Sequence, residues 1–195
     1  MADTRAKLLC KAGYNEALNG PGAVLGTKGG IVFPYTPVIT TQTQVGYNKY
    51  DLTHTNYQPM AFSHSQAPML QVTANFIQQS TEDVDYLLGA LHFFRVVTKM
   101  NFGQEDPQRG TPPPVLEFSA YGPVNFSRVP VLVQGVSTTY PDDIDYILDS
   151  SGENRVPAMM TIALDLAVHY SPSKTRSTFS LNGFASGELY SRGFI

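Results

Sequence analysis

Side chains that could do chemistry are few in this sequence and poorly spaced for it. The four histidines do not stand at the short spacings of a zinc site, and the single cysteine, Cys10, cannot complete a thiolate cage. We therefore expect no metal site, no cofactor and no internal disulfide. The histidines are interpreted as structural or surface residues; they are His54, His64, His92 and His169.

Acidic residues gather in one segment towards the C-terminus. Residues 142–153 contain five of the chain's 16 acidic residues and no basic residue: Asp142, Asp143, Asp145, Asp149 and Glu153. A calcium loop of the EF-hand type needs glycine at its sixth position and glutamate at its twelfth, and neither register fits. Glycosidase carboxylates are defined by their separation in space, which adjacency in sequence does not reveal. We interpret the segment as a solvated acidic turn or a face that meets positive charge.

Motifs of nucleophilic catalysis and phosphate binding are absent from the sequence. It has no Gly-x-Ser-x-Gly elbow, and the glycine-rich run from Gly20 to Gly30 lacks the Gly-Lys-Ser/Thr ending of a phosphate-binding loop. That run predicts a linker without regular structure, so residues 1–30 are expected to form a flexible arm. We expect a protein without enzymatic activity.

Hydrophobic periodicity predicts a chain that is mainly β, in the α+β class. Alternating apolar residues and runs of β-branched residues are typical of strands. Pro34 and Pro37 lack the N–H of a sheet ladder, so the first strand is expected at an edge or a bend. Long loops are predicted at 53–67 and 101–114. The predicted β segments are 31–41, 42–53, 70–76, 115–121, 123–139 and 160–170.

One helix is predicted over residues 81–98. Ser80 and the acidic residues after it fit an N-cap and a first turn that favours negative charge. The apolar residues cover close to half of the circumference, more than the stripe of roughly 100° that packing on one core requires. The helix is therefore either sunk deep in one core or in contact with a further element. The candidate contacts with another subunit are Tyr86, Ala90, Phe93 and Val97.

Composition favours self-association over nucleic-acid or membrane binding. Charged residues make up 15% of the chain, and so few charges protect poorly against association. The net charge of −3 argues against a dedicated nucleic-acid binder, and no apolar run reaches the roughly 20 residues of a membrane helix. Residues 171–195 retain large apolar side chains, so this C-terminal arm is expected to pack on its own domain or on a neighbour. Phe194 and Ile195 are candidate contacts there.

Four co-linear blocks together resemble a known family. They resemble the baseplate–tail-tube junction and tube-initiator proteins of contractile-tailed bacteriophages. The similarity covers residues 31–170, which we expect to form one tube-like β domain, and it does not extend over residues 1–30. The blocks are YDLTHTNYQPMAFSHSQAPMLQVTANF (50–76), ALHFFRVVTKMNFG (90–103), GTPPPVLEFSAYG (110–122) and VPVLVQGVSTTYPDDIDYI (129–147).

The resemblance implies packed antiparallel sheets with a flanking helix, in a β-sandwich or barrel of the tail-tube type. Six copies would form a ring whose inner strands close into one barrel around a DNA channel. Such a ring sits on the baseplate hub in the virion tail, after assembly in the host cytoplasm, and starts the tail tube. The implied partners are further copies, hub proteins and the tube protein, with sheath as a further candidate; DNA passes non-specifically, and no membrane anchor is implied. The repeating tube subunit stays open as an alternative.

The lining of such a channel is expected to be neutral or acidic, because a basic lining would hold DNA by counterion release. Contacts with the next ring are expected at Asp142, Asp143 and Asp145. Two other function classes stay open: a receptor- or carbohydrate-binding β-sandwich, and an enzyme that uses the carboxylates of residues 142–149. The candidate lumen-facing residues lie on the polar faces of two predicted strands: Gln71, Thr73, Asn75, Thr161, Asp165 and His169.

Overall fold

The computed structural model describes residues 4–11, 16–104 and 108–195. The helices of these ranges are α1 (Thr81–Val97), α2 (Pro172–Thr178) and α3 (Leu181–Ala185), with the 3₁₀ helices η1 (Glu16–Leu18), η2 (Gly20–Lys28) and η3 (Glu188–Arg192). The strands are β1 (Lys7–Cys10), β2 (Gly30–Val32), β3 (Val38–Gln42), β4 (Val45–Lys49), β5 (Met60–Ser65), β6 (Met69–Ile77), β7 (Leu116–Ala120), β8 (Phe126–Thr139), β9 (Tyr146–Leu148), β10 (Arg155–Pro157) and β11 (Met159–Val168).

Seven of these strands form one antiparallel sheet in the order β2-β1-β7-β8-β11-β6-β3. The mainly β, α+β class is thereby confirmed. β2 and β3 are the outer strands, and Pro34 and Pro37 lie in the connection between them, which confirms the predicted edge position. Within the described part of a single chain, the sheet is not closed into a barrel.

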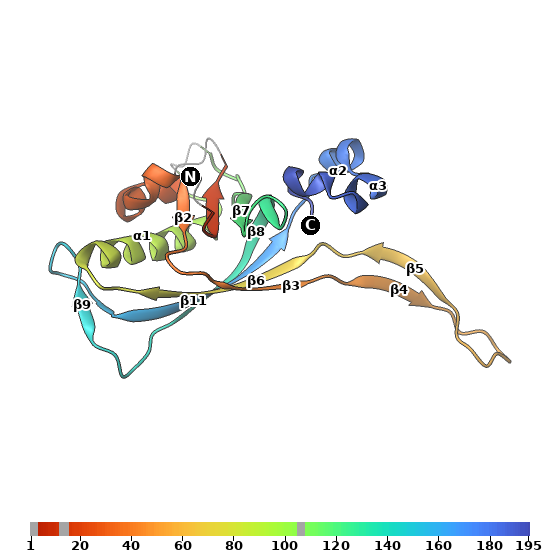
Figure 1. Ribbon diagram of the computed structural model, residues 1–195, viewed down its shortest axis with the longest axis horizontal. Helices are drawn as coiled ribbons and strands as arrows, with labels where there is room; N and C mark the ends of the chain where they lie inside the picture. Colours follow the sequence, from red (N-terminus) through yellow and green to blue (C-terminus); the bar gives the residue numbers. More distant parts are fainter. Residues whose placement is uncertain (1–3, 12–15, 105–107) are drawn as a thin grey trace.

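A long hairpin continues two strands of the sheet into solvent (Figure 1). β4 extends β3 and β5 leads into β6, and the two pair with each other. We call β4, β5 and the intervening residues 50–59 the arm. The loop predicted over residues 53–67 is therefore wrong for residues 60–65. Polar residues hide the periodicity of this strand, whose pairing is supported by cross-strand contacts such as Tyr47 with Phe62, at 6.2 Å between ring centroids.

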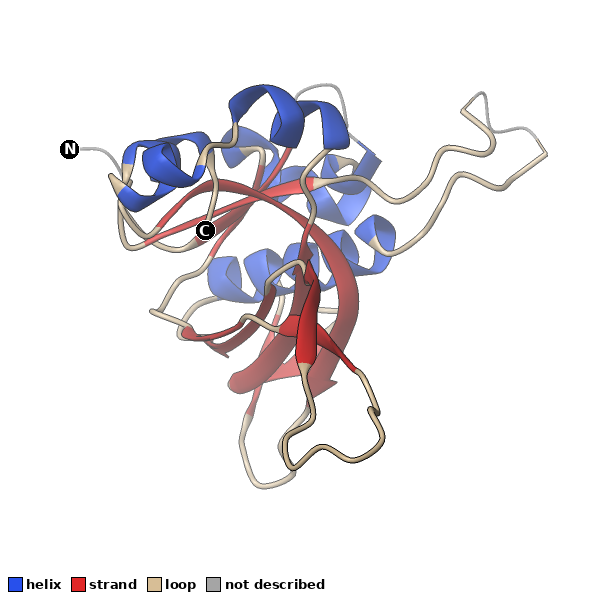
Figure 2. Cartoon of the chain, turned by 90° about the vertical axis from the view of Figure 1, so that its right-hand side faces the viewer, coloured by secondary structure: helices blue, strands red, loops and turns tan. Residues whose placement is uncertain are grey.

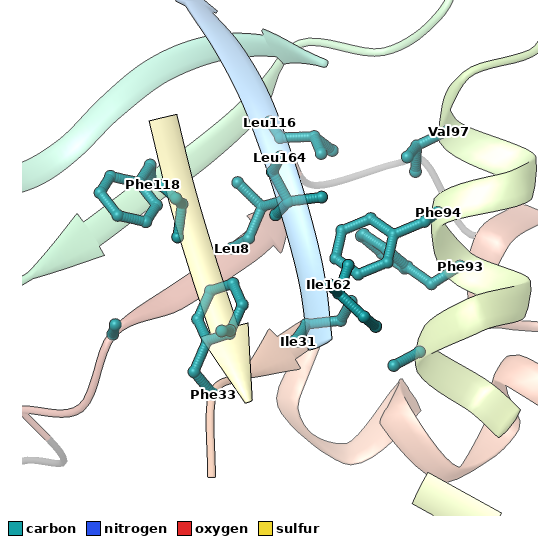
Figure 3. Packing of buried hydrophobic residues seen from close by; sticks show 14 of the residues in the cluster. Leu8, Ile31, Phe33, Phe93, Phe94, Val97, Leu116, Phe118, Ile162 and Leu164 are labelled. Atoms are coloured by element: carbon teal, nitrogen blue, oxygen red, sulfur yellow. The ribbon is translucent and has the colours of Figure 1, made fainter. Parts of the chain in front are cut away.

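Helix α1 lies along one face of the sheet, which curves past it (Figures 1 and 2). A capping box confirms its predicted start: Ser80 Oγ accepts the Asp83 N–H at 3.3 Å, and Asp83 Oδ2 accepts the Ser80 N–H at 3.1 Å. Phe93, Phe94 and Val97 point from the helix into the core (Figure 3). They pack in one cluster with residues of several strands: Leu8, Ile31, Phe118, Ile162 and Leu164.

The wide apolar arc of α1 is explained within one chain. Its second contact is η2, where Leu25 is fully buried and a Cβ on Gly89 would lie 3.0 Å from the Pro21 carbonyl oxygen. Three of the four candidate subunit contacts on this helix are accordingly corrected, while Tyr86 is only partly buried. Ala90, Phe93 and Val97 lie inside the chain's own core and offer no surface to another subunit.

Residues 1–30 were expected to form a flexible N-terminal segment, and this expectation is wrong for residues 4–11 and 16–30. β1 lies between β2 and β7, with Leu8 fully buried. Glycine serves close packing here: a Cβ on Gly22 would lie 2.2 Å from the Ala17 carbonyl oxygen, and one on Gly30 would lie 2.4 Å from that of Leu8. The remainder of this expectation, residues 1–3 and 12–15, lies outside the described residues.

The C-terminal segment packs on the chain's own domain. Phe194 is 3% exposed and stacks on Tyr170, with 4.7 Å between ring centroids. The Ile195 N–H donates to the Tyr170 hydroxyl at 3.0 Å, and the Lys174 ammonium donates to the Arg192 carbonyl at 2.8 Å. Phe194 is therefore occupied within its own chain, which corrects its assignment as a contact with another subunit, while Ile195 is half-buried.

Candidate channel face and assembly borders

One face of the sheet, opposite α1, collects neutral polar side chains. The register places Thr161 opposite Asn75 and Asp165 opposite Gln71, and Thr161 Oγ1 donates to Asn75 Oδ1 at 2.9 Å. Five of the six predicted lumen-facing residues thus share one face of β6 and β11. We call the following set on β3, β6, β11 and β8 the channel face: Val38, Thr40, Gln42, Gln71, Thr73, Asn75, Thr161, Ala163, Asp165, Gly135, Ser137 and Thr139.

His169, the sixth predicted residue, lies beyond the end of β11. Its N–H donates to the Pro130 carbonyl at 2.9 Å, which places it beside the first half of β8 rather than within the channel face. The parts of the channel face on β3 and β8 were not predicted from sequence. In β8 the alternation of polar and apolar residues is interrupted, because the register with β11 shifts by one residue near Gln134.

The electrostatics of the channel face are simple. Its residues include one ionisable group, Asp165, and no lysine or arginine. Asp165 Oδ2 lies 3.1 Å from where a Cβ on Gly135 would be, so glycine leaves room for this carboxylate beside β8. A face of this composition offers DNA phosphates no fixed cation to bind.

The alternation of hydrogen bonding along β3 shows which of its backbone groups point away from β6, its one partner strand among the described residues. The Val168 N–H donates to the Pro68 carbonyl at 3.0 Å, and the Gln78 N–H donates to that of Ala158 at 2.9 Å. Even-numbered residues of β6 therefore face β11, and odd-numbered ones face β3. Since Thr40 is opposite Gln71, the N–H and C=O of Ile39 and Thr41 point outwards. We call these two residues the β3 border.

The second half of β8 has an outward edge of the same kind. Among the described residues, β7 pairs with β8 only between Phe126 and Val131, while β11 pairs with it as far as Thr139. Odd-numbered residues of β11 face β8, so Val136 and Thr138 point away from β11. We call these two residues the β8 border. A hollow of about 350 Å³ lies beside it, lined also by Leu91 and Phe94 of α1.

The arm exposes apolar side chains along most of its length. Val45, Tyr47 and Phe62 share one of its faces and are 46%, 57% and 61% exposed. An isolated two-stranded hairpin is at best marginally stable in water. Apolar surface gathered on such a projection is typical of an interaction site.

The acidic segment contains a turn that is held by hydrogen bonds to Asp149. Asp149 is buried, and its carboxylate accepts hydrogen bonds from the Asn154 side chain at 2.6 Å and from Ser151 Oγ at 2.8 Å. These bonds, that of the Asn154 amide foremost, lower the pKa of Asp149 to about 2. Asp142, Asp143 and Asp145 are exposed. Within the described ranges, no group of three or more His, Cys, Asp or Glu residues is arranged to hold a metal ion.

Comparisons with known proteins give no family. No protein-family model matches the chain, and no curated protein matches it significantly. Among the described residues, no helix is both long enough and apolar enough to span a membrane. Functional inference therefore depends on the channel face, the two borders and the arm.

Proposed function

We propose that this chain is a structural ring protein of a contractile phage tail, whose copies join edge to edge around a channel for DNA. The observation that carries the proposal is the block of strands β8-β11-β6-β3. It bears the channel face on one side and α1 on the other, and it ends in an outward strand edge on both sides. A sheet with two such edges is completed by pairing with further copies.

The directions of the strands suit this joining. β8, β11, β6 and β3 alternate in direction, so β3 of one copy lies antiparallel to β8 of the next. The outward groups of Ile39 and Thr41 then face those of Val136 and Thr138. Such an interface uses two different surfaces of each subunit and closes into a ring if the rotation between copies is right. Closure leaves no free strand edge in the barrel.

The channel face supports transport rather than retention of DNA. Its side chains are mostly amides and hydroxyls, and its one carboxylate repels phosphate. In the ring, these side chains would line the lumen, because α1 covers the other face of the sheet. DNA could then slide without release of counterions at each step.

The resemblance of the sequence blocks supplies the biological setting. We infer a hexameric ring on the baseplate hub, which starts polymerisation of the tail tube. The repeating tube subunit is the alternative, because it needs the same borders and the same channel face. The arm would reach the neighbouring copy, where its exposed apolar face is covered.

Two proline variants of adjacent residues test the joining. Thr41→Pro removes an N–H that points outwards, whereas Thr40→Pro removes an N–H that faces β6. We expect Thr41→Pro to form no rings in electron micrographs and to unfold at the temperature of wild-type monomers at high dilution, since assembly itself raises the unfolding temperature. Thr40→Pro serves as the control, with a lowered unfolding temperature. Rings formed by a folded Thr41→Pro chain would overturn the proposal.

A further inference from the structure

The third outward edge of the sheet, at β2, differs from the other two. The Phe33 N–H donates to the Ala6 carbonyl and the Cys10 N–H donates to that of Gly29, both at 2.9 Å. Odd-numbered residues here therefore face β1, and even-numbered ones face away. We call the outward residues Gly30, Val32 and Pro34 the β2 border.

A single side chain forms hydrogen bonds with the outward backbone groups of this border. The Tyr86 hydroxyl of α1 accepts the Val32 N–H at 2.8 Å and donates to the Val32 carbonyl at 2.7 Å. It thereby makes both hydrogen bonds that an added strand would make at this residue. Burial raises the pKa of Tyr86, so the hydroxyl keeps the proton that it donates at neutral pH. Pro34, the next outward residue, has no N–H to offer.

We propose that Tyr86 closes the β2 border to strand addition and so determines which edges of the sheet join copies of this chain. The proposal rests on the proposed function, since it assumes that copies pair through their strand edges. An edge that is open at β2 would accept β3 or β2 of another copy and give open or misjoined assemblies. With Val32 occupied and Pro34 lacking a donor, Gly30 offers the one N–H left at the border. Addition is then restricted to the β3 and β8 borders.

The sequence places this device far from the strand that it protects. Val32 and Tyr86 are 54 positions apart, and Tyr86 stands on the first half of α1, whose other side chains build the core. The helix thus combines two tasks. Phe93 and Phe94 fix it on the sheet, and that position brings the Tyr86 hydroxyl to the β2 border.

The test uses the full chain with Thr41→Pro, in which the β3 border is blocked. Tyr86→Phe is added to it, with Tyr146→Phe as the matched control. Tyr146 is 69% exposed, and its hydroxyl makes no hydrogen bond within the described part of the chain. We expect Tyr86→Phe to convert monomers into dimers or larger species in sedimentation velocity. The control should stay monomeric, as should Pro34→Ala, which adds an outward N–H but keeps Tyr86.

Amide hydrogen exchange separates the possible failures. In the Thr41→Pro monomer the Val32 amide should exchange slowly, and in a Tyr86→Phe monomer at high dilution about tenfold faster. A folded Tyr86→Phe chain that stays monomeric at all concentrations overturns the proposal. If Tyr86→Phe does not fold, fast exchange of Val32 in Thr41→Pro overturns it and slow exchange supports it. Assembly of Thr41→Pro alone would instead contradict the proposed function, because it places joining elsewhere.

Discussion

The β2 and β3 borders are the two ends of one sheet, and they are treated in opposite ways. At β2, the N–H and C=O of Val32 are both bonded to the Tyr86 hydroxyl, and the next outward residue is a proline. At β3, Ile39 and Thr41 point outwards beside an arm with exposed aromatic residues. The difference teaches that one end of the sheet is finished within the chain, while the other end is suited to a partner.

Packing follows the same division. On the β2 side, η1, η2 and α1 enclose Ala17, Leu25 and Leu87, each fully buried. On the β3 side, the arm contributes surface without a core of its own, and Tyr57 near its tip is 88% exposed. We infer that stability resides mainly in the first region and assembly in the second.

The largest expected effect comes from mixing two chains that are each blocked at one border. Thr41→Pro keeps the β8 border, and Val136→Pro keeps the β3 border. Each chain then has one usable edge. The mixture should therefore give heterodimers, with one copy of each variant, and no rings, while either variant alone stays monomeric. Native mass spectrometry reads both results. Rings in the mixture would contradict the claim that copies join only through the β3 and β8 borders.

A large effect on stability is expected on the closed side alone. Leu25→Ala should lower the free energy of unfolding by about 2–5 kcal/mol, because it leaves a cavity between η2 and α1. Leu52→Ala, at an arm residue that is 59% exposed, should change it by less than about 0.5 kcal/mol. Chemical denaturation in the monomeric Thr41→Pro background measures both. Equal losses would contradict the division of tasks.

A moderate effect is expected when the charge of the channel face is reversed. Asp165→Lys should let assembled rings bind duplex DNA at low salt, with each phosphate neutralised steepening log K against log salt by about 0.9. Asp142→Lys makes the same change of charge outside the channel face and should have no such effect. Fluorescence anisotropy across a salt series compares them. Equal DNA binding by the two variants would contradict the placement of Asp165 in the lumen.

The smallest effect concerns acid stability at the β9–β10 turn. The pKa of Asp149 in the folded chain, about 2, lies below its ordinary value of 3.8, so its contribution to stability is complete above about pH 4 and is lost as the pH falls through 2. Asp149→Asn should therefore flatten the fall of the unfolding temperature between pH 4 and pH 2. Asp83, whose pKa is also lowered, is present in both proteins and cancels. Identical slopes would count against the turn's role.

The elements with their own periodicity could be predicted from the sequence. The alternation of Leu70, Val72, Ala74 and Phe76 identifies β6, and the Ser80 cap identifies the start of α1. The N-terminal residues could not, because β1 is short and acquires its place from β2 and β7 on either side. The glycines of η2 signal flexibility in sequence but permit close packing in the fold.

The polar side of the candidate site was predictable for the same reason, and its borders were not. Gln71, Thr73 and Asn75 alternate with buried residues within one strand. Border status depends on hydrogen-bond parity across several strands and on where β7 ends, so it is a property of the sheet. The pairing of Tyr86 with Val32 is likewise invisible in sequence, because the two are brought together only when α1 packs.

Amide hydrogen exchange, residue by residue, in monomers and in assembled rings tests the central claim most directly. We predict that the amides of Ile39, Thr41, Val136 and Thr138 become strongly protected on assembly, because they enter a ladder between copies. Val32 should be protected equally in both states. Protection confined to the arm, with the four border amides unchanged, would contradict a barrel shared between copies.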